Sequence, residues 1–511
     1  MSTLGSLGWL DSPAGNVWHE RWRNATSWGR MTCAAVLLCA ATATVSAGQT
    51  FKSLFSFDGA DGAQPFDGLV QGANGNLYGT TYAGGAGFYK NDGTVFEIKP
   101  SGKLSTIYSF CPQYECTDRD HPAALLVLAT NGNFYGTTRV GGANDSGTVF
   151  EITPAGKLTV LYSFCSQPGC TDGNDPLCGA LVQATNGDFY GTTNSGGLGN
   201  SYCVSVGCGT VFKITPAGKL TTLYSFCQQA NCADGAGPYS GLVQATDGNF
   251  YGTTAAFGAN GEGTVFKITP TGKLTTLHSF CSGCPDGANP LAGLIQASDG
   301  DLYGSTASGG SNNGGTVFKI TLGGTLTRLA SLYGIGASPY AALIQATDGN
   351  FYGTTLYGGD GTGGVSGGVA FEMTPAGELT TLYNFCSHPD CTDGAEPYDA
   401  LVQATNGKLY ETTANYGVNF DGTVFALSVG LGPFVKANPT SGKVGAKVTI
   451  LGNNLTGSTS VTFNGTEATF TVNPTGTAIT TNVPSGATTG SVQVTTPSGT
   501  LTSNVPFRVT Q

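Results

Sequence analysis

The chain has 511 residues, of which only 10% are charged, and its formal net charge is −11. This length allows more than one domain and a sizeable core. The sequence contains no cluster of Lys and Arg, so we expect no nucleic-acid partner, because phosphate binding requires such a cluster.

Residues 1–47 look like a targeting segment that does not belong to the fold. Three arginines precede an apolar run from Cys33 to Val45, and small residues follow up to Ala47. This order is typical of a secretory signal peptide, and the run is too short for a stable membrane anchor. We expect cleavage after Ala47 and no membrane span in the mature chain, whether translation starts at Met1 or at Met31.

An eight-residue motif, NGNFYGTT in one copy, occurs seven times in the rest of the chain. The copies begin at Asn74, Asn131, Asn186, Asp247, Asp299, Asp348 and Asn406. Each copy follows a short apolar run and precedes a Gly-rich loop, a Gly-Thr-Val-Phe-type run, a Pro-x-Gly turn and a Leu-Thr-Thr-Leu-Tyr-type run. The pattern predicts four short antiparallel strands per repeat, with the motif as the second strand. No helical periodicity competes with it, so we expect an all-β fold.

The turns between these strands have specific signals. The Asn-Gly or Asp-Gly pair before the second strand predicts a tight hairpin with positive φ at both residues. Pro216 and Gly218 predict a bulged hairpin between the third and fourth strands, with Gly in the left-handed region. The motif's aromatic residue is expected to pack between repeats and its Gly to permit close strand approach, with direct chemistry as the alternative.

The repeat length and the two ends of the repeat region predict a closed ring. Four strands in a unit of about 50 residues are typical of a propeller blade of kelch-like size. Residues 50–57 form a fourth strand without the first three, and the last repeat stops after its third strand. The N-terminal strand would complete the last blade and remove exposed edges. We expect a seven-bladed β-propeller over residues 48–430.

Twelve cysteines after the signal peptide fall into local pairs with short spacing. The pairs are Cys111/Cys116, Cys165/Cys170, Cys203/Cys208, Cys227/Cys232, Cys281/Cys284 and Cys386/Cys391. In an exported protein such spacing favours disulfides, with zinc binding as the alternative. Cys178 has no obvious partner.

An Asp-x-x-x-Pro pattern precedes the first strand of six repeats. The acids are Asp61, Asp118, Asp172, Asp234, Asp286 and Asp393, and the sixth connection, between Gly334 and Pro339, has no acid. Six carboxylates around a ring form one candidate cation site. The alternative that we favour is an Asx-turn that caps its own backbone.

Recognition is expected on one face of the ring. The tight turns lie on one side, while the Gly-rich loops and the connections between repeats share the other side and vary in length. The sequence has no GxSxG, HExxH or phosphate-loop motif, so we expect no catalytic residue, no cofactor and no metal. Paired carboxylates of the glycosidase type remain the catalytic alternative.

After residue 430 the composition shifts to Val, Thr, Asn and Gly in alternating runs with turn signals, which predicts a small β-sandwich over residues 431–511. This segment resembles the IPT/TIG immunoglobulin-like family. The resemblance implies a spacer or adhesive unit. The segment has four basic residues (Lys436, Lys443, Lys447 and Arg508), so we do not expect the DNA-binding role of some members.

The repeats, with their YGTT…GTVF…LTTLYSF periodicity, resemble the bacterial GloVer tandem repeats of "choice-of-anchor" proteins. The resemblance implies an exported or cell-surface protein. No apolar tail follows residue 507, so we expect simple export, to the periplasm or beyond. The leading hypothesis is a monomeric, non-catalytic binding or adhesion protein with an extracellular protein or glycan ligand. The alternative is a propeller enzyme, a glycoside hydrolase or lyase, that acts on polysaccharide.

Overall fold

The computed structural model describes residues 49–87, 91–112, 121–122, 124–177, 179–199, 202–203, 207–361 and 366–510. These residues form an all-β structure with almost no helix. Its helical elements are single 3-10 turns: η1 (Pro168–Cys170), η2 (Ala230–Cys232), η3 (Ser311–Asn313) and η5 (Pro389–Cys391). No helix in the described ranges is long and apolar enough to cross a membrane. The predicted signal peptide lies outside these ranges.

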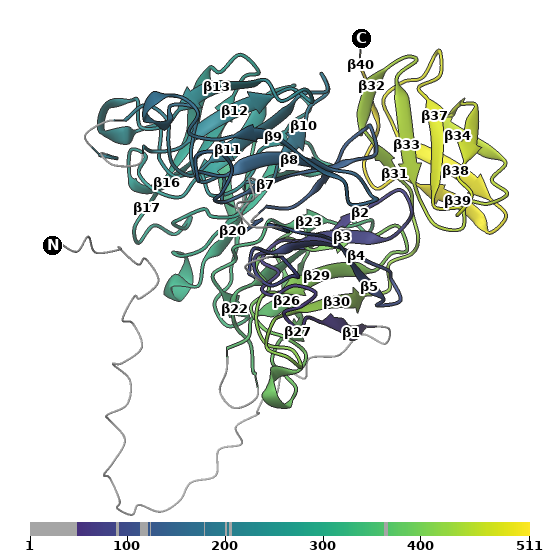
Figure 1. Ribbon diagram of the computed structural model, residues 1–511, viewed down its shortest axis with the longest axis horizontal. Helices are drawn as coiled ribbons and strands as arrows, with labels where there is room; N and C mark the ends of the chain where they lie inside the picture. Colours follow the sequence, from purple (N-terminus) through teal and green to yellow (C-terminus); the bar gives the residue numbers. More distant parts are fainter. Residues whose placement is uncertain are drawn as a thin grey trace, which may run out of the picture. The chain divides into compact units, whose positions relative to one another are not determined.

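Each repeat forms an antiparallel sheet of four strands in chain order (Figure 1). The first sheet contains β2 (Val70–Gln71), β3 (Leu77–Thr81), β4 (Thr94–Ile98) and β5 (Leu104–Ser109). The second contains β6 (Val127–Leu128), β7 (Phe134–Thr138), β8 (Thr148–Ile152) and β9 (Leu158–Ser163). The third contains β10 (Val182–Gln183), β11 (Phe189–Thr193), β12 (Thr210–Ile214) and β13 (Leu220–Ser225). The fourth and fifth are β14 (Val243–Gln244), β15 (Phe250–Thr254), β16 (Gly261–Ile268) and β17 (Leu274–Cys281); and β18 (Ile295–Gln296), β19 (Leu302–Thr306), β20 (Thr316–Ile320) and β21 (Leu326–Ser331). The sixth is β23 (Ile344–Gln345), β24 (Phe351–Thr355), β26 (Val369–Met373) and β27 (Leu379–Asn384), beside which β22 (Gly336–Ala337) pairs with β25 (Tyr357–Gly358).

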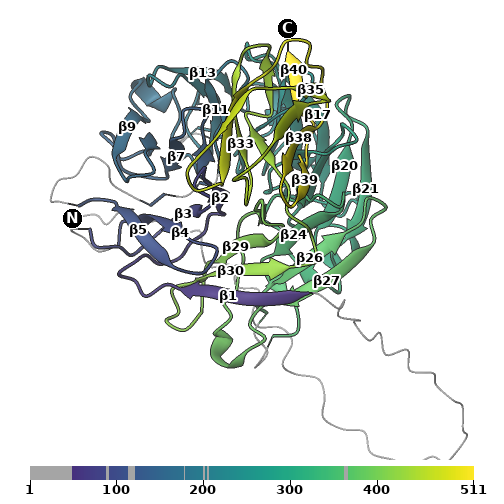
Figure 2. The same ribbon diagram turned by 90° about the vertical axis from the view of Figure 1, so that its right-hand side faces the viewer.

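The seventh sheet combines strands from both ends of the repeat region. It contains β28 (Val402–Gln403), β29 (Leu409–Thr413), β30 (Thr423–Ser428) and, at its edge, β1 (Thr50–Ser56). Figure 2 shows β1 beside β30, and the two strands are antiparallel, with Thr50 opposite Ser428. The pairing predicted for the N-terminal strand is therefore present.

Both tight turns of a repeat have the same geometry, which corrects one expectation from the sequence. In the second repeat the amide of Gly132 donates to the carbonyl of Ala129, and Gly132 has a φ of 87°. Asn131 is not in the left-handed region, so the turn is a bulged hairpin and not a two-residue turn with positive φ at both positions. Gly218, with a φ of 84°, closes the Pro-x-Gly turn as predicted.

Hydrophobic clusters lie between successive sheets. Tyr135 of β7 stacks on Phe189 of β11, with ring centroids 4.1 Å apart, and equivalent pairs join other neighbouring repeats. The last and first sheets also share a cluster, in which Tyr410 and Val424 pack with Leu77 and Phe96. The motif's aromatic residue therefore packs between repeats, as expected.

The glycine of the motif leaves room for side chains of its own sheet. A Cβ at Gly136 would lie 2.7 Å from the ring of Phe150 and 2.9 Å from Leu126. Because real Cβ atoms do not approach so closely, a side chain at position 136 would require Phe150 or Leu126 to move. The space is filled by a ring and not by a neighbouring backbone.

Glutamine side chains join the first strands of neighbouring sheets. The amide of Thr405, after β28, donates to Oε1 of Gln71 in β2 at 2.9 Å, so that this bond connects the last repeat to the first. The same bond occurs at five other junctions, through Gln183, Gln244, Gln296, Gln345 and Gln403. In the second repeat Leu128 occupies this position.

The C-terminal strands form two further four-stranded sheets around a core of their own, which includes Val448, Ile450, Ile479 and Phe507. One sheet has the order β31 (Lys436–Asn438), β33 (Lys447–Leu451), β37 (Ala478–Asn482), β36 (Phe470–Val472); the other has the order β35 (Thr466–Glu467), β34 (Ser460–Phe463), β38 (Val492–Thr496), β39 (Gly499–Thr502). In addition, β32 (Ser441–Lys443) pairs in parallel with β40 (Arg508–Thr510).

Candidate functional site

A cavity of about 150 Å³ lies where the segments that precede the first strands of several repeats come together. Because strand direction alternates, these segments belong to the face that carries the connections between repeats. Among the residues that line the cavity are four aromatic residues and two acids: Phe66, Tyr239, Tyr340, Tyr398, Asp67 and Asp399. The face expected to carry recognition therefore contains an aromatic and acidic cavity.

The aromatic rings form a continuous wall. Tyr398 lies next to Phe66 and Tyr340, with ring centroids 5.2 and 5.1 Å apart. The hydroxyls of Tyr239 and Tyr398 are hydrogen-bonded at 3.0 Å, and Tyr340 packs edge-on against Tyr239 at 6.3 Å. The three tyrosines are thus in mutual contact. All four aromatic residues occupy the same repeat position, three residues before the leucine that enters the first strand.

The acids come from the first and the last repeat, which are neighbours in the structure. Asp67 precedes β2, is 3% exposed and accepts a 2.6 Å hydrogen bond from the hydroxyl of Thr80. Asp399 precedes β28 and accepts bonds from the amides of Gly68 (2.8 Å) and Ala400 (2.7 Å). Its contact with Gly68 places the two carboxyl groups on neighbouring parts of the cavity wall.

A third acid, Glu411, lies behind them in β29. It is fully buried, and its Oε1 accepts a 3.3 Å bond from the hydroxyl of Thr354. Its Oε2 has no hydrogen-bond partner among the described residues. Glu411 stands at the glycine position of the motif, which reads YETT here and YGTT or YGST in the other six copies.

These three carboxyl groups have raised pKa values. Burial, followed by repulsion from Asp399, raises the pKa of Asp67 to about 8, although the Thr80 hydroxyl opposes the shift. Burial also raises the pKa of Asp399, against two amide donors, and burial together with Asp399 raises the pKa of Glu411 well above its usual value. The physical cause is the same in each case: the charged form loses water and gains no positive partner.

These three acids were not predicted from the sequence, although each differs from the residues at the same position of most other repeats. Asp67 and Asp399 stand two residues before the leucine of the first strand, where the other repeats have Ala, Gly or Ser. Glu411 replaces the motif glycine in one copy only. The sequence signal for these acids is therefore a difference between the copies of the repeat, and not a feature that the copies share.

The acids of the Asp-x-x-x-Pro pattern are dispersed and engaged locally. Asp172 is 2% exposed, and accepts hydrogen bonds from the hydroxyl of Tyr162 (2.7 Å) and the amides of Ser166 (2.8 Å) and Gln167 (3.2 Å). Asp234 and Asp393 have the same partners in their own repeats. Each carboxylate therefore caps the loop that precedes it in the chain.

The remaining acids of this pattern differ from one another. Asp61 accepts a bond from the amide of Asp58, and burial raises its pKa to about 6. Asp286 lies 2.7 Å from Nε2 of His278, and Asp118 is outside the described residues. Among the described residues no three of these acids bring oxygen atoms within 4.8 Å of one another.

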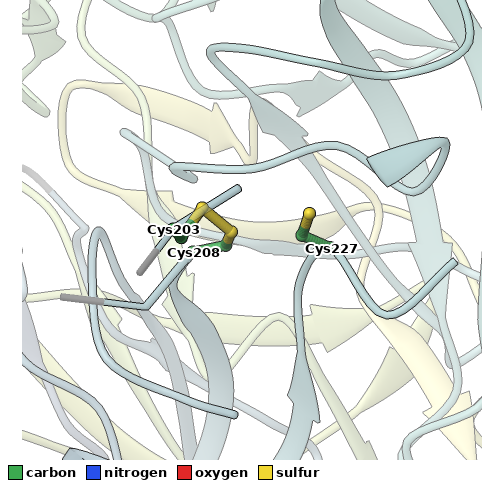
Figure 3. A group of neighbouring side chains, drawn as sticks. All are labelled: Cys203, Cys208 and Cys227. Carbon is green, nitrogen blue, oxygen red and sulfur yellow. A yellow bond between two sulfur atoms is a disulfide. The ribbon is translucent and has the colours of Figure 1, made fainter. Parts of the chain in front are cut away.

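The cysteines pair locally. Disulfides join Cys165–Cys170, Cys203–Cys208, Cys227–Cys232, Cys281–Cys284 and Cys386–Cys391. Cys111 is also in a disulfide, while Cys116 and Cys178 lie outside the described residues. Figure 3 shows Cys227 beside the Cys203–Cys208 disulfide, with the three sulfur atoms within 4.8 Å. Sulfur atoms in disulfides are not thiolates, so this group is not a zinc site in the oxidised protein.

Solved structures with similar folds share little sequence with this chain. A fungal alcohol oxidase of the AA5 family, in complex with copper, is 14% identical with a TM-score of 0.51, over 91% of this chain and 100% of that one. A periplasmic gluconolactonase from Pseudomonas aeruginosa is 17% identical with a TM-score of 0.42, over 69% of this chain and 99% of that one. No curated protein matches the chain. The fold is all-β and propeller-like.

The repeats determine the family. The model of the Gloeobacter/Verrucomicrobia repeat matches residues 91–297, 201–425 and 282–479, which overlap and together include more than half of the chain. These ranges contain six of the seven motif copies, from Asn131 to Asn406. The chain belongs to the Gloeobacter/Verrucomicrobia repeat family.

Proposed function

We propose that the chain is an exported, non-catalytic binding protein whose cavity receives a small ligand. The observation that carries this proposal is the cavity itself, in which three tyrosines and a phenylalanine surround two acids. Apolar walls with a few convergent polar groups are typical of ligand sites. The variable connections place this cavity on the face that is best suited to recognition.

In this proposal residues 48–430 are a seven-bladed β-propeller and residues 431–511 are an immunoglobulin-like IPT/TIG domain. Clusters between successive sheets support the first part, including the one between the last and first sheets. The separate core of the C-terminal sheets supports the second part. The propeller binds the ligand, and the C-terminal domain serves as a spacer or adhesive unit.

Export is part of the proposal. Local disulfides fit an oxidising compartment outside the cytoplasm. Residues 1–47 would serve as the signal peptide, with the mature chain in the periplasm or outside the cell.

The paired acids also suggest a second function, an enzyme that cleaves polysaccharide. Such an enzyme needs two carboxyl groups on either side of a bound glycosidic bond, with sugar units on both sides of that bond. The cavity, at about 150 Å³, is smaller than the roughly 300–1,000 Å³ of typical ligand pockets. Its size therefore favours a small ligand over a polysaccharide chain.

Thermal unfolding with a panel of small metabolites, both charged and neutral, tests the binding function. A ligand of the cavity at one hundred times its Kd should stabilise the protein by about 2.7 kcal/mol. The gain should disappear in Tyr340→Leu, which removes one ring of the wall. No ligand-dependent shift, combined with release of reducing ends from polysaccharide that Asp67→Asn abolishes, would favour the enzyme instead.

A further inference from the structure

The cavity is acidic without a positive counterpart. Among the described residues no Lys, Arg or His forms an ion pair with Asp67, Asp399 or Glu411. Their partners are hydroxyls and backbone amides, and one oxygen of Glu411 has none. Buried acids normally have such a partner, since an isolated buried charge is costly. A ligand with positive charge would supply what the protein does not.

A metal ion does not fit this arrangement well. Calcium takes six to eight oxygen ligands at about 2.3–2.6 Å, so its protein ligands must converge. Among the described residues these three acids do not form a group whose oxygen atoms all lie within 4.8 Å of one another. The three acids do not converge on one point, which suits a larger cation.

The aromatic wall points to the same kind of ligand. Aromatic faces attract cations, and rings that surround a site are a general means of binding organic ammonium ions. Phe66, Tyr340 and Tyr398 pack side by side, and Tyr239 closes the group through its hydroxyl. Rings can replace water around an ammonium group that carries apolar substituents, whereas a strongly hydrated metal ion gains less from them.

The cavity size limits the part of the ligand that enters. A volume of about 150 Å³ matches a cavity that holds a benzene-sized molecule. A trimethylammonium or similar head group is of this size, and a polymer is not.

We propose that this cavity binds the ammonium head of a small organic cation, with Asp67 and Asp399 as its counter-charges and the tyrosines as its apolar wall. The proposal rests on the binding function proposed above and names the ligand class for it. Glu411 is not among the residues that line the cavity and does not touch the ligand. The cation favours the ionised acids, so binding should release a proton and strengthen as the pH rises toward 8.

Calorimetric titration of the whole chain with choline tests this proposal. The control ligand is 3,3-dimethyl-1-butanol, which has the same shape as choline but no charge. Choline should bind about tenfold more tightly than the alcohol, or better. Affinity for choline should be higher at pH 8 than at pH 6, by up to about tenfold per pH unit if one proton is released.

Two variants test whether the charge of the cavity acids contributes to choline binding. Asp399→Asn should weaken choline binding by about tenfold or more, while Asp360→Asn, which removes an exposed acid, should leave it unchanged. If Asp399→Asn fails to fold, Tyr340→Leu tests the aromatic wall instead and should also weaken choline binding, while the comparison of choline with the neutral alcohol still tests the charge. Vesicles of phosphatidylcholine distinguish two sources of the same chemistry: a free ligand predicts choline binding alone, and a lipid head group predicts binding of both.

Two results would overturn the proposal. One is equal affinity for choline and the neutral alcohol, and the other is no binding of choline at either pH. If a neutral metabolite stabilises the protein and Tyr340→Leu abolishes that effect, the binding function stands while the ammonium ligand is rejected.

Discussion

The folded protein contains three acids whose charged form is unfavourable: Asp67, Asp399 and Glu411. The five other repeats have Ala, Gly or Ser at the position of the two aspartates, and the six other copies of the motif have glycine at the position of the glutamate, so the sheet does not require acids there. Burial raises the pKa of all three, and repulsion from Asp399 adds to the shift at Asp67 and Glu411, which means that the folded protein disfavours their charged forms. A cost concentrated at one junction of a repetitive structure indicates selection for function.

This cost predicts how stability depends on pH. The pKa of Asp67 rises from an ordinary 3.8 to about 8 in the folded protein, so between these values the folded state holds a proton that the unfolded state has lost. Its contribution to stability is therefore complete below about pH 4 and is lost as the pH rises through 8. One such proton corresponds to a slope of about 1.4 kcal/mol per pH unit.

Urea unfolding at pH 5, 6 and 7 measures that slope. The free energy of unfolding should fall less steeply with pH in Asp67→Asn than in the native protein, because the amide does not titrate. Asp360→Asn is the control and should leave the slope unchanged. Parallel pH profiles for the native protein and Asp67→Asn would show that Asp67 titrates normally.

At the scale of the strand, a repeated glutamine joins one sheet to the next. Gln71 is 5% exposed, accepts from the amide of Thr405 and donates to its hydroxyl at 3.1 Å. Gln183 makes the equivalent bond to the amide of Thr130, but in an exposed position. The junction between the last and first repeats is therefore the more completely buried of the two.

We expect Gln71→Leu to be the more damaging of two matched substitutions. It leaves a buried amide without an acceptor, and should reduce the free energy of unfolding by about 2 kcal/mol. Gln183→Leu leaves the amide of Thr130 in contact with water, and should reduce the free energy of unfolding by about 1 kcal/mol or less. Urea unfolding compares them directly. If Gln71→Leu costs no more than Gln183→Leu, the last and first sheets do not meet as described.

Much of each sheet could be predicted from the sequence because the same pattern of strand and turn residues occurs seven times. Alternating residues, Gly at the turns and Pro-x-Gly fix the four strands, and the unmatched strand at residues 50–57 indicates its partner. The hairpin at Asn131 was assigned the wrong turn because Asn-Gly fits two geometries, and only the backbone distinguishes them. Turn type depends on the register of the strands that the turn joins.

The site could not be predicted in the same way. Its acids come from residues 67, 399 and 411, and no motif marks these positions, although the predicted pairing of residues 50–57 with the last repeat brings the two ends of the repeat region together. The repeated Asp-x-x-x-Pro acids attracted attention because they recur, yet Asp172 and its equivalents cap their own loops. In a repeat protein shared residues build the scaffold, and residues that break the pattern are the better candidates for function.

At the scale of the whole molecule, the junction of the first and last repeats joins the two ends of the repeat region and contributes two acids to the proposed binding site. The same junction brings β1 to β30, Gln71 to Thr405 and Asp67 to Asp399. The residues that complete the seventh sheet and the two acids of the cavity thus come from the same two ends of the repeat region, while Tyr239 and Tyr340 of the cavity wall come from repeats between them. We expect ligand binding to stabilise this junction in particular.

A crystal structure of the whole chain grown with choline tests the account most directly. The account predicts an ammonium group in the cavity, against the rings of Tyr340 and Tyr398 and beside the carboxyl groups of Asp67 and Asp399. Choline bound elsewhere, or an unchanged cavity in crystals soaked with choline well above its measured Kd, would contradict it.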